Sequence, residues 1–311
     1  MPKRRKPFTR IRNPRKLIPT EATTRLLLGI YYHEGVLSQR QIVREFFPGK
    51  TKSWPEHRLQ NYFDHHLVNK FNAEWVNGEH LKETVYTLGT QGARHVAHQM
   101  EIDFTSLTWR PKPRWMTLSH DLKLNDFRFA VTRQANNLDG FQLVRWISEF
   151  ELHQNQKHKI PGRPDGFFLL RRNSPTHAGR VEELAILVEV DNATHPLGRF
   201  ISHKVKPALK FVGSERYKQI FGIGSGAYFV ITTGLKRLAH LKDKTEAAGG
   251  SGLFYFTTFD QAKKDVLTAP IWQMAGSNER LTIKDMPLKP RINRGVNHPT
   301  QRQILIPTLT A

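Results

Sequence analysis

Hydrophobic positions near the N-terminus recur at the three- and four-residue spacing of amphipathic helices. They predict four helices, over residues 21–33, 38–46, 53–67 and 91–99. Capping-box spacing marks two of the starts, since Ser38 precedes Gln41 and Ser53 precedes Glu56 by three residues. Between the last two helices, alternating residues at 71–75 and 82–88 flank an Asn-Gly turn and predict a hairpin. Three short helices followed by a hairpin are the elements of a winged helix-turn-helix, which we expect over residues 19–99.

The pattern changes after a proline- and arginine-rich stretch at residues 100–117, which we expect to be a linker. The chain beyond it predicts helices at 119–136, 197–212 and 260–267 and strands at 143–153, 166–170, 184–190, 227–233 and 253–257. This order predicts an α/β (α+β) domain with a mixed sheet over residues 118–280. Residues 1–18 are expected to be a flexible basic arm, and residues 281–311 a basic tail.

The charge of the chain indicates a polyanionic partner. Its 311 residues include 48 Lys plus Arg against 27 Asp plus Glu, a formal net charge of +21. Residues 1–16 hold eight of the basic side chains, and removing them still leaves a surplus of thirteen. Because a body this basic repels itself unless it binds a polyanion, we expect double-stranded DNA as the partner. Two weaker alternatives are an anionic membrane surface, for which no suitable amphipathic helix is found, and basic tails that only aid solubility.

Composition excludes several classes of protein. The chain has no cysteine, which excludes disulfide frameworks, thiolate zinc sites and cysteine nucleophiles. No apolar run approaches the roughly 20 residues that span a bilayer, and residues 1–16 lack the apolar core of a signal peptide. We therefore expect a soluble cytoplasmic protein that does not associate with membranes.

The expected winged helix provides candidate DNA-binding residues. Its third helix is the element that enters the major groove in such folds. The basic and polar side chains best placed for DNA there, together with two in the N-terminal arm, are Lys50, Lys52, Arg58, Gln60, Arg4 and Arg5. The same fold also serves as a protein–protein adaptor, so that alternative stays open.

Acidic residues lie at the strand ends of the second domain. Asp165 precedes the strand at 166–170, and Glu189 and Asp191 end the strand at 184–190. Because strand side chains alternate, Glu189 and Asp191 share one face. A carboxylate at the end of a buried strand is costly unless it is paired, hydrogen-bonded or bound to a cation. Converging carboxylates suit a hard ion such as Mg²⁺ or Mn²⁺, which would polarise a phosphodiester and activate water.

The helix expected at residues 197–212 carries an unusually placed lysine. Lys204 falls within its apolar stripe, whereas Lys206 and Lys210 lie on the solvated side, where they are further candidates for DNA binding. A lysine in an apolar stripe either extends its ammonium to an edge or points to an anionic group. Both interpretations stay open for Lys204.

Taken together, these motifs resemble the replication-relaxation family of plasmids and other mobile elements. The resemblance covers roughly residues 20–235 and rests on Pro164-Asp165, Glu189-Val190-Asp191 with Thr194, Lys204, the segments VYTLGTQGARHVA and SHDLKLNDF, and the strand at 146–152. It implies a winged helix joined to a domain similar to PD-(D/E)xK nucleases, acting in plasmid replication or DNA relaxation. Replication or transposition proteins of the same element would be further partners.

The resemblance also implies roles for individual residues. Asp165 and Glu189 would be metal ligands assisted by the Val190 carbonyl, often joined by an acid such as Asp126 or Asp121 from the first helix. Glu149, expected on the first strand, is a further possibility.

The family pattern is broken at one position. Nucleases of this class usually carry a lysine two residues after the glutamate, where this chain has Asp191. The ammonium of that lysine steers the nucleophile and neutralises the charge of the transition state, so Lys204 would have to supply it here. Two hypotheses follow: a metal-dependent DNA nuclease with Asp165, Glu189, Asp191 and Lys204 at its centre, or a non-catalytic initiator or transcriptional regulator with a degenerate site.

Overall fold

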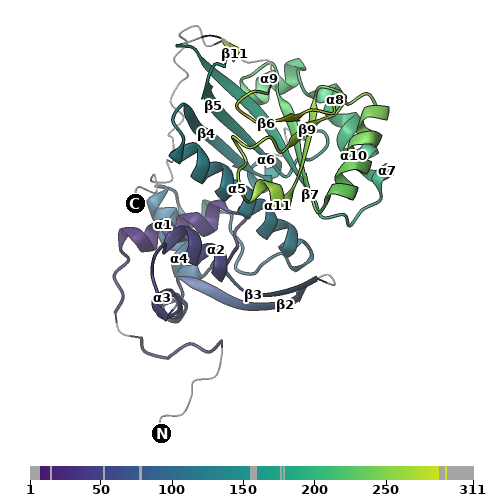
Figure 1. Ribbon diagram of the computed structural model, residues 1–311. Helices are drawn as coiled ribbons and strands as arrows, with labels where there is room; N and C mark the ends of the chain where they lie inside the picture. The colour runs from purple at the N-terminus through teal and green to yellow at the C-terminus, as the bar shows by residue number, and fades with distance from the viewer. Residues whose placement is uncertain are drawn as a thin grey trace. The chain divides into compact units, whose positions relative to one another are not determined.

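The computed structural model describes residues 8–14, 16–51, 53–76, 79–154, 160–175, 177, 179–286 and 291–292. The chain forms two compact units, the first ending at Asn125 and the second beginning at Asp126. Each unit combines helices with a β-sheet (Figure 1), as the sequence predicts. None of the described helices combines the length and the hydrophobicity that a membrane span requires.

The first unit has the element order of a winged helix-turn-helix. Its elements are α1 (Glu21–Tyr32), β1 (Leu37–Ser38), α2 (Gln39–Phe46), α3 (Ser53–Asp64), β2 (Val68–Val76), β3 (Glu79–Leu88) and α4 (Thr90–Gln99). The strands pair antiparallel in the order β1-β3-β2, so the first strand closes against the wing hairpin. The predicted fold of this unit is therefore confirmed.

Local capping explains where these helices begin. Both halves of the capping box of Ser38 and Gln41 are formed at the start of α2, as predicted. The helix α3 begins at Ser53 itself, one residue before the start that the predicted box implies. This helix also ends at Asp64, before the predicted residue 67, since His66 takes a left-handed conformation with φ 57°.

The segment 100–117 is not the free linker that the sequence indicated. It contains two short 3₁₀ helices, Phe104–Ser106 and Trp115–Thr117. The carbonyl of Pro111 accepts hydrogen bonds from Asn69 and Thr87 of the wing strands, at 2.9 and 2.8 Å. These bonds attach the segment to the first unit, and the boundary between the units lies further on, within α5 (Leu118–Asn137).

The second unit is built on one large mixed sheet (Figure 1). Its strands run in the order β10-β9-β8-β7-β6-β5-β4, with β11 paired to β6. Their bounds are β4 (Phe141–Ser148), β5 (Gly166–Asn173), β6 (Val181–Asp191), β7 (Ala227–Thr232), β8 (Phe254–Thr258), β9 (Trp272–Met274), β10 (Arg280–Leu281) and β11 (Arg291–Ile292). Strands β4, β5 and β6 are antiparallel, whereas β6, β7 and β8 are parallel, which confirms the predicted mixed sheet.

Helices cover both faces of this sheet. One face carries an apolar core of Leu187, Tyr228 and Phe254, covered by α7 (Leu197–Phe200), the π-helical η4 (Ile201–Val205), α8 (Lys206–Phe211), α9 (Glu215–Phe221) and α10 (Leu235–Ala247). On the other face, Phe127 of α5 contacts the rings of Trp146, Phe168 and Trp272. Strand β6 is buried from Glu182 to Asp191, as expected for a central strand.

Several elements of this unit differ from the predictions. The strand predicted at 143–153 ends at Ser148, and Glu149 begins the helix α6 (Glu149–Gln154) instead of lying on the strand. Ser148 and Glu151 form reciprocal hydrogen bonds that cap this helix. The helices α9 and α10 and the strand β9 were not predicted, and α11 (Phe259–Ala262) is shorter than the expected helix.

The segment predicted as a basic tail begins as packed structure. Arg172 of β5 donates hydrogen bonds to the carbonyls of Ile283, Lys284 and Met286, and the side chain of Ile283 is fully buried. Residues 281–286 of the predicted basic tail are therefore packed, because a buried guanidinium holds this stretch on the sheet. Residues 293–311 lie outside the described part of the chain.

Candidate functional site

Asp165 is held at the end of β6 by backbone hydrogen bonds. Its N–H donates to the Val188 carbonyl at 2.8 Å, which extends the pairing of β5 with β6 by one residue. Its carboxylate accepts the N–H of Val190 at 2.7 Å, and only 7% of the residue is exposed. This second bond fixes the carboxylate beside the stretch of β6 that carries Glu189.

Lys204 points at Glu189. Its Nζ lies 2.6 Å from Oε2 of Glu189 and also donates to the carbonyl of Arg163 at 2.7 Å. Of the two interpretations of this lysine, the structure therefore favours the one in which it meets an anionic group. It belongs to η4, a π-helical turn between α7 and α8, and such turns are frequent at functional sites.

The charges around Lys204 show that Asp165 and Glu189 lie together. Burial by itself would lower the pKa of Lys204, but the carboxylates of Glu189, Asp165 and Glu149 outweigh it and raise that pKa above its ordinary value. The ammonium therefore stays protonated throughout the neutral pH range.

The phenol of Tyr228 lies in the same surroundings. Burial raises the pKa of Tyr228 well above its ordinary value, and the charges of Glu189 and Asp165 raise it further. Its hydroxyl is buried without a hydrogen-bond partner among the described residues. We name Asp165, Glu189, Lys204 and Tyr228 the carboxylate–lysine cluster.

A half-buried histidine lies next to this cluster. Nε2 of His153 is 3.3 Å from the carbonyl of Pro164, the residue before Asp165. Burial and the positive charge of Arg163 lower the pKa of His153, while Glu149 partly opposes them. The imidazole is therefore neutral at pH 7. The sequence provided no reason to place His153 or Arg163 here, because the strand expected at 143–153 would have carried His153 away.

Asp191, at the position of the usual motif lysine, is engaged elsewhere. Its two carboxylate oxygens accept hydrogen bonds from Arg237 of α10 at 2.9 and 3.0 Å, and Thr232 donates to it at 2.7 Å. The hydrogen bonds that Arg237 donates to Asp191 raise the pKa of Arg237. Asp191 shares the face of Glu189 as predicted, but its charge is neutralised by α10, a helix that sequence reasoning missed.

The acids expected from the first helix do not complete a ligand set. Asp121 is fully buried in the first unit and pairs with Arg114 at 2.6 Å. Asp126 lies on α5 in the second unit. Over the described ranges, no group of three or more histidine and acidic side chains is arranged to hold a metal ion, so the expected trio of Asp165, Glu189 and Asp126 is not formed.

Two carboxylates still fit a magnesium-type ion. Mg²⁺ commonly takes one or two carboxylates from a protein and completes its coordination with water and substrate phosphates. Asp165 and Glu189 offer that donor chemistry, held rigidly at the end of a buried strand.

Comparison with known protein families gives one match, to replication-relaxation over residues 28–222. The match covers well over half of the chain. This protein belongs to the replication-relaxation family. No curated protein and no solved structure matches it.

The family match covers only some of the candidate functional residues. It extends from α1 through the winged helix to Asp165, Glu189 and Lys204, and ends at Gly222. Tyr228 and Arg237 lie beyond it. One member of the carboxylate–lysine cluster, Tyr228, and the partner of Asp191 therefore come from chain outside the matched region.

The candidate DNA-binding residues of this replication-relaxation protein cluster around one tryptophan. Trp54 of α3 is 38% exposed and packs edge-on against Phe47. The ammonium of Lys50 and the guanidinium of Arg58 lie 5.8 and 5.3 Å from the centre of its ring, in cation–π geometry. Gln60 donates a hydrogen bond to Asp64 at 3.4 Å.

The remaining candidates are placed as follows. Lys206 and Lys210 are exposed on α8, on the solvated side that the sequence predicted. Arg4, Arg5 and Lys52 lie outside the described residues.

Proposed function

We propose that this protein binds duplex DNA of a plasmid or mobile element through its winged helix and cuts or nicks it with a metal-dependent site in the second unit. The family description, replication-relaxation, supports a role in replication or in the relaxation of DNA. The observation that carries the catalytic part is the convergence of Asp165, Glu189 and Lys204 at the end of β6.

Each residue of the cluster has a role in this proposal. Mg²⁺ or Mn²⁺ bound by Asp165 and Glu189 would polarise the phosphodiester and lower the pKa of an attacking water. The Val190 N–H orients the Asp165 carboxylate. Lys204 supplies the positive charge that other nucleases of this class take from the strand, and it neutralises negative charge as the phosphate reacts.

Plasmid nicking tests this proposal directly. Purified protein should convert supercoiled plasmid to open-circular or linear DNA in the presence of Mg²⁺ or Mn²⁺, and EDTA should stop the reaction. Tight duplex binding with no cutting under either metal would reject the nuclease function.

A second function is favoured by one specific observation. Asp191 replaces the usual lysine and is paired with Arg237, so the strand itself presents no cation to the phosphate. Under this alternative the second unit grips DNA or recruits a replication or transposition protein without cutting. It predicts stable complexes and no product in the plasmid assay.

The winged helix makes a separate prediction about binding. Replacing both Lys50 and Arg58 by alanine should remove two phosphate contacts and lower duplex affinity about tenfold or more. Each phosphate contact contributes about 0.9 to the slope of log K against log salt. The slope should therefore fall by about 1.8 in a fluorescence anisotropy titration.

A matched variant controls for lost charge. Arg25 on α1 and Lys112 are two cations of the same unit that do not belong to α3, and replacing both by alanine should leave the slope unchanged. Equal losses in the two double variants would contradict recognition through α3.

A further inference from the structure

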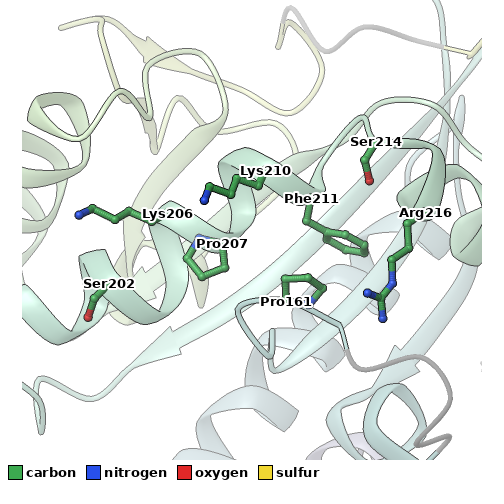
Figure 2. A pocket seen from close by; sticks show the side chains of 8 residues that line it. All are labelled: Pro161, Ser202, Lys206, Pro207, Lys210, Phe211, Ser214 and Arg216. Carbon is green, nitrogen blue, oxygen red and sulfur yellow. The ribbon is translucent and has the colours of Figure 1, made fainter.

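A pocket of about 510 Å³ lies along the helix that carries Lys204 (Figure 2). Ser202 comes from η4, Lys206 and Lys210 from α8, and Arg216 from α9, while Pro161 closes the pocket from the loop before β5. No part of the carboxylate–lysine cluster lines it, so it is a separate site on the same helix.

The pocket is strongly cationic. Lys206, Lys210 and Arg216 all line it, and Figure 2 shows the two lysines extending in the same direction from α8, with Arg216 beyond Phe211. Within the described part of the chain, neither lysine has an acidic partner. The nearby Glu215 is directed to Lys218, at 3.9 Å. Two unpaired ammonium groups and a guanidinium around one cavity favour an anionic ligand.

Part of the pocket wall is apolar. Pro161 and Pro207 face the cavity with their rings, and Phe211 lies between them and Arg216 (Figure 2). The lining therefore suits a ligand that combines negative charge with an apolar portion. A nucleotide has both, in its phosphate and its base, and the volume is within the range of small-molecule sites.

The pocket and the cluster share their supporting elements. The loop that provides Pro161 also provides the Arg163 carbonyl that receives Lys204. Gly162 of this loop lies against the helix, where an added Cβ would be in van der Waals contact with the Lys204 carbonyl, at 3.4 Å. Lys204 points inward to β6 while Lys206 is exposed, so one short helix segment serves both sites.

We propose that this pocket binds a nucleotide of single-stranded DNA, with its phosphates on Lys206 and Lys210 and its base against Pro161 and Pro207. A duplex keeps its bases stacked inside and presents phosphates alone, so it would leave the apolar wall unused. A single strand can turn a base outward into such a cavity. This inference rests on the proposed function, which identifies the ligand as DNA. It adds that the substrate is DNA with an unpaired region.

Binding to single-stranded DNA in EDTA tests the pocket without any cutting. A fluorescent oligothymidylate of about 12 nucleotides matches typical single-strand site sizes. Replacing Lys206 and Lys210 by alanine should weaken binding of this oligonucleotide about tenfold. The slope of log K against log salt should fall by about 1.4, because each phosphate contact with a single strand contributes about 0.7. Affinity for a duplex probe should stay unchanged.

Two further variants separate charge from shape. Lys244→Ala with Lys264→Ala removes two exposed lysines of the same unit that do not line the pocket, and should change nothing. Ser202→Trp fills the cavity and keeps every charge, so it should also weaken single-strand binding.

Three outcomes would overturn the inference. The first is unchanged oligothymidylate binding in the Lys206 and Lys210 double variant, and the second is unchanged binding with Ser202→Trp. The third is that thymidine monophosphate displaces the probe as effectively as the oligonucleotide does. The last would assign the pocket to a free nucleotide. Failure of the proposed function appears elsewhere, as absent plasmid nicking or absent duplex binding, so the two failures are distinguishable.

Discussion

Replacing Asp165 by asparagine is expected to reduce metal-dependent plasmid nicking by about 10²–10³-fold while duplex affinity is retained. The amide oxygen of asparagine can still accept the Val190 N–H, so the local structure at the end of β6 is preserved. What is lost is a negative charge at the proposed metal position, and electrostatic groups at reacting centres are worth factors of about 10²–10³ each. Nicking rates at saturating Mg²⁺ measure the effect.

The control for this variant is Asp243→Asn, which removes a carboxylate from the exposed side of α10. It should nick at the rate of the unmodified protein. Undiminished nicking by Asp165→Asn would show that the carboxylate–lysine cluster is not the cutting site. Loss of duplex binding together with nicking would instead mean that the substitution had disturbed the fold.

Replacing Arg172 by alanine is expected to lower the free energy of unfolding of the second unit by about 3–5 kcal/mol, the usual cost of breaking a buried ion pair. The Arg172 side chain is 3% exposed and contacts Glu182 through two nitrogens at 3.0 and 2.9 Å. It also donates to the carbonyls of Lys284 and Met286 at 2.8 and 2.9 Å. Alanine would leave a buried carboxylate without its countercharge and release the chain after β10.

The neighbouring Arg171 provides a matched control on the same strand. It pairs with Glu183 at 2.8 Å, but its side chain is 39% exposed. Its partner Glu183 is buried, with a side chain only 6% exposed, but water can reach the space that the partly exposed Arg171 would leave. Arg171→Ala should therefore cost clearly less stability than Arg172→Ala. Urea denaturation followed by circular dichroism separates the two cases. Similar losses for both variants would show that Arg172 does not anchor the C-terminal segment.

These two expectations concern different uses of buried charge. At Arg172 the pair joins segments far apart in the chain and has a structural role. At Glu189 and Lys204 the pair lies beside a second carboxylate and a buried phenol, where strand packing alone does not require so many polar groups. Strongly perturbed titratable groups that gather in this way are typical of functional sites.

Local patterns predicted most elements of the first unit. The box of Ser38 and Gln41 begins a helix because its two hydrogen bonds involve residues only three apart. The hairpin likewise depends on neighbouring residues. The same local signal at Ser148 and Glu151 was present but missed, so Glu149 was placed on a strand when it begins α6.

The alternation of side chains on β6 singled out Glu189 and Asp191 from the sequence alone, and the periodicity of the following helix singled out Lys204. Asp165 was found by its place directly before a predicted strand. All three signals depend only on residues close in the chain. Which charge neutralises which was decided by the tertiary structure. The π-helical turn brings Lys204 to Glu189, and the packing of α10 brings Arg237 to Asp191, across 15 and 46 residues of chain. No local rule specifies such partners, since they depend on how distant helices pack on one face of the sheet.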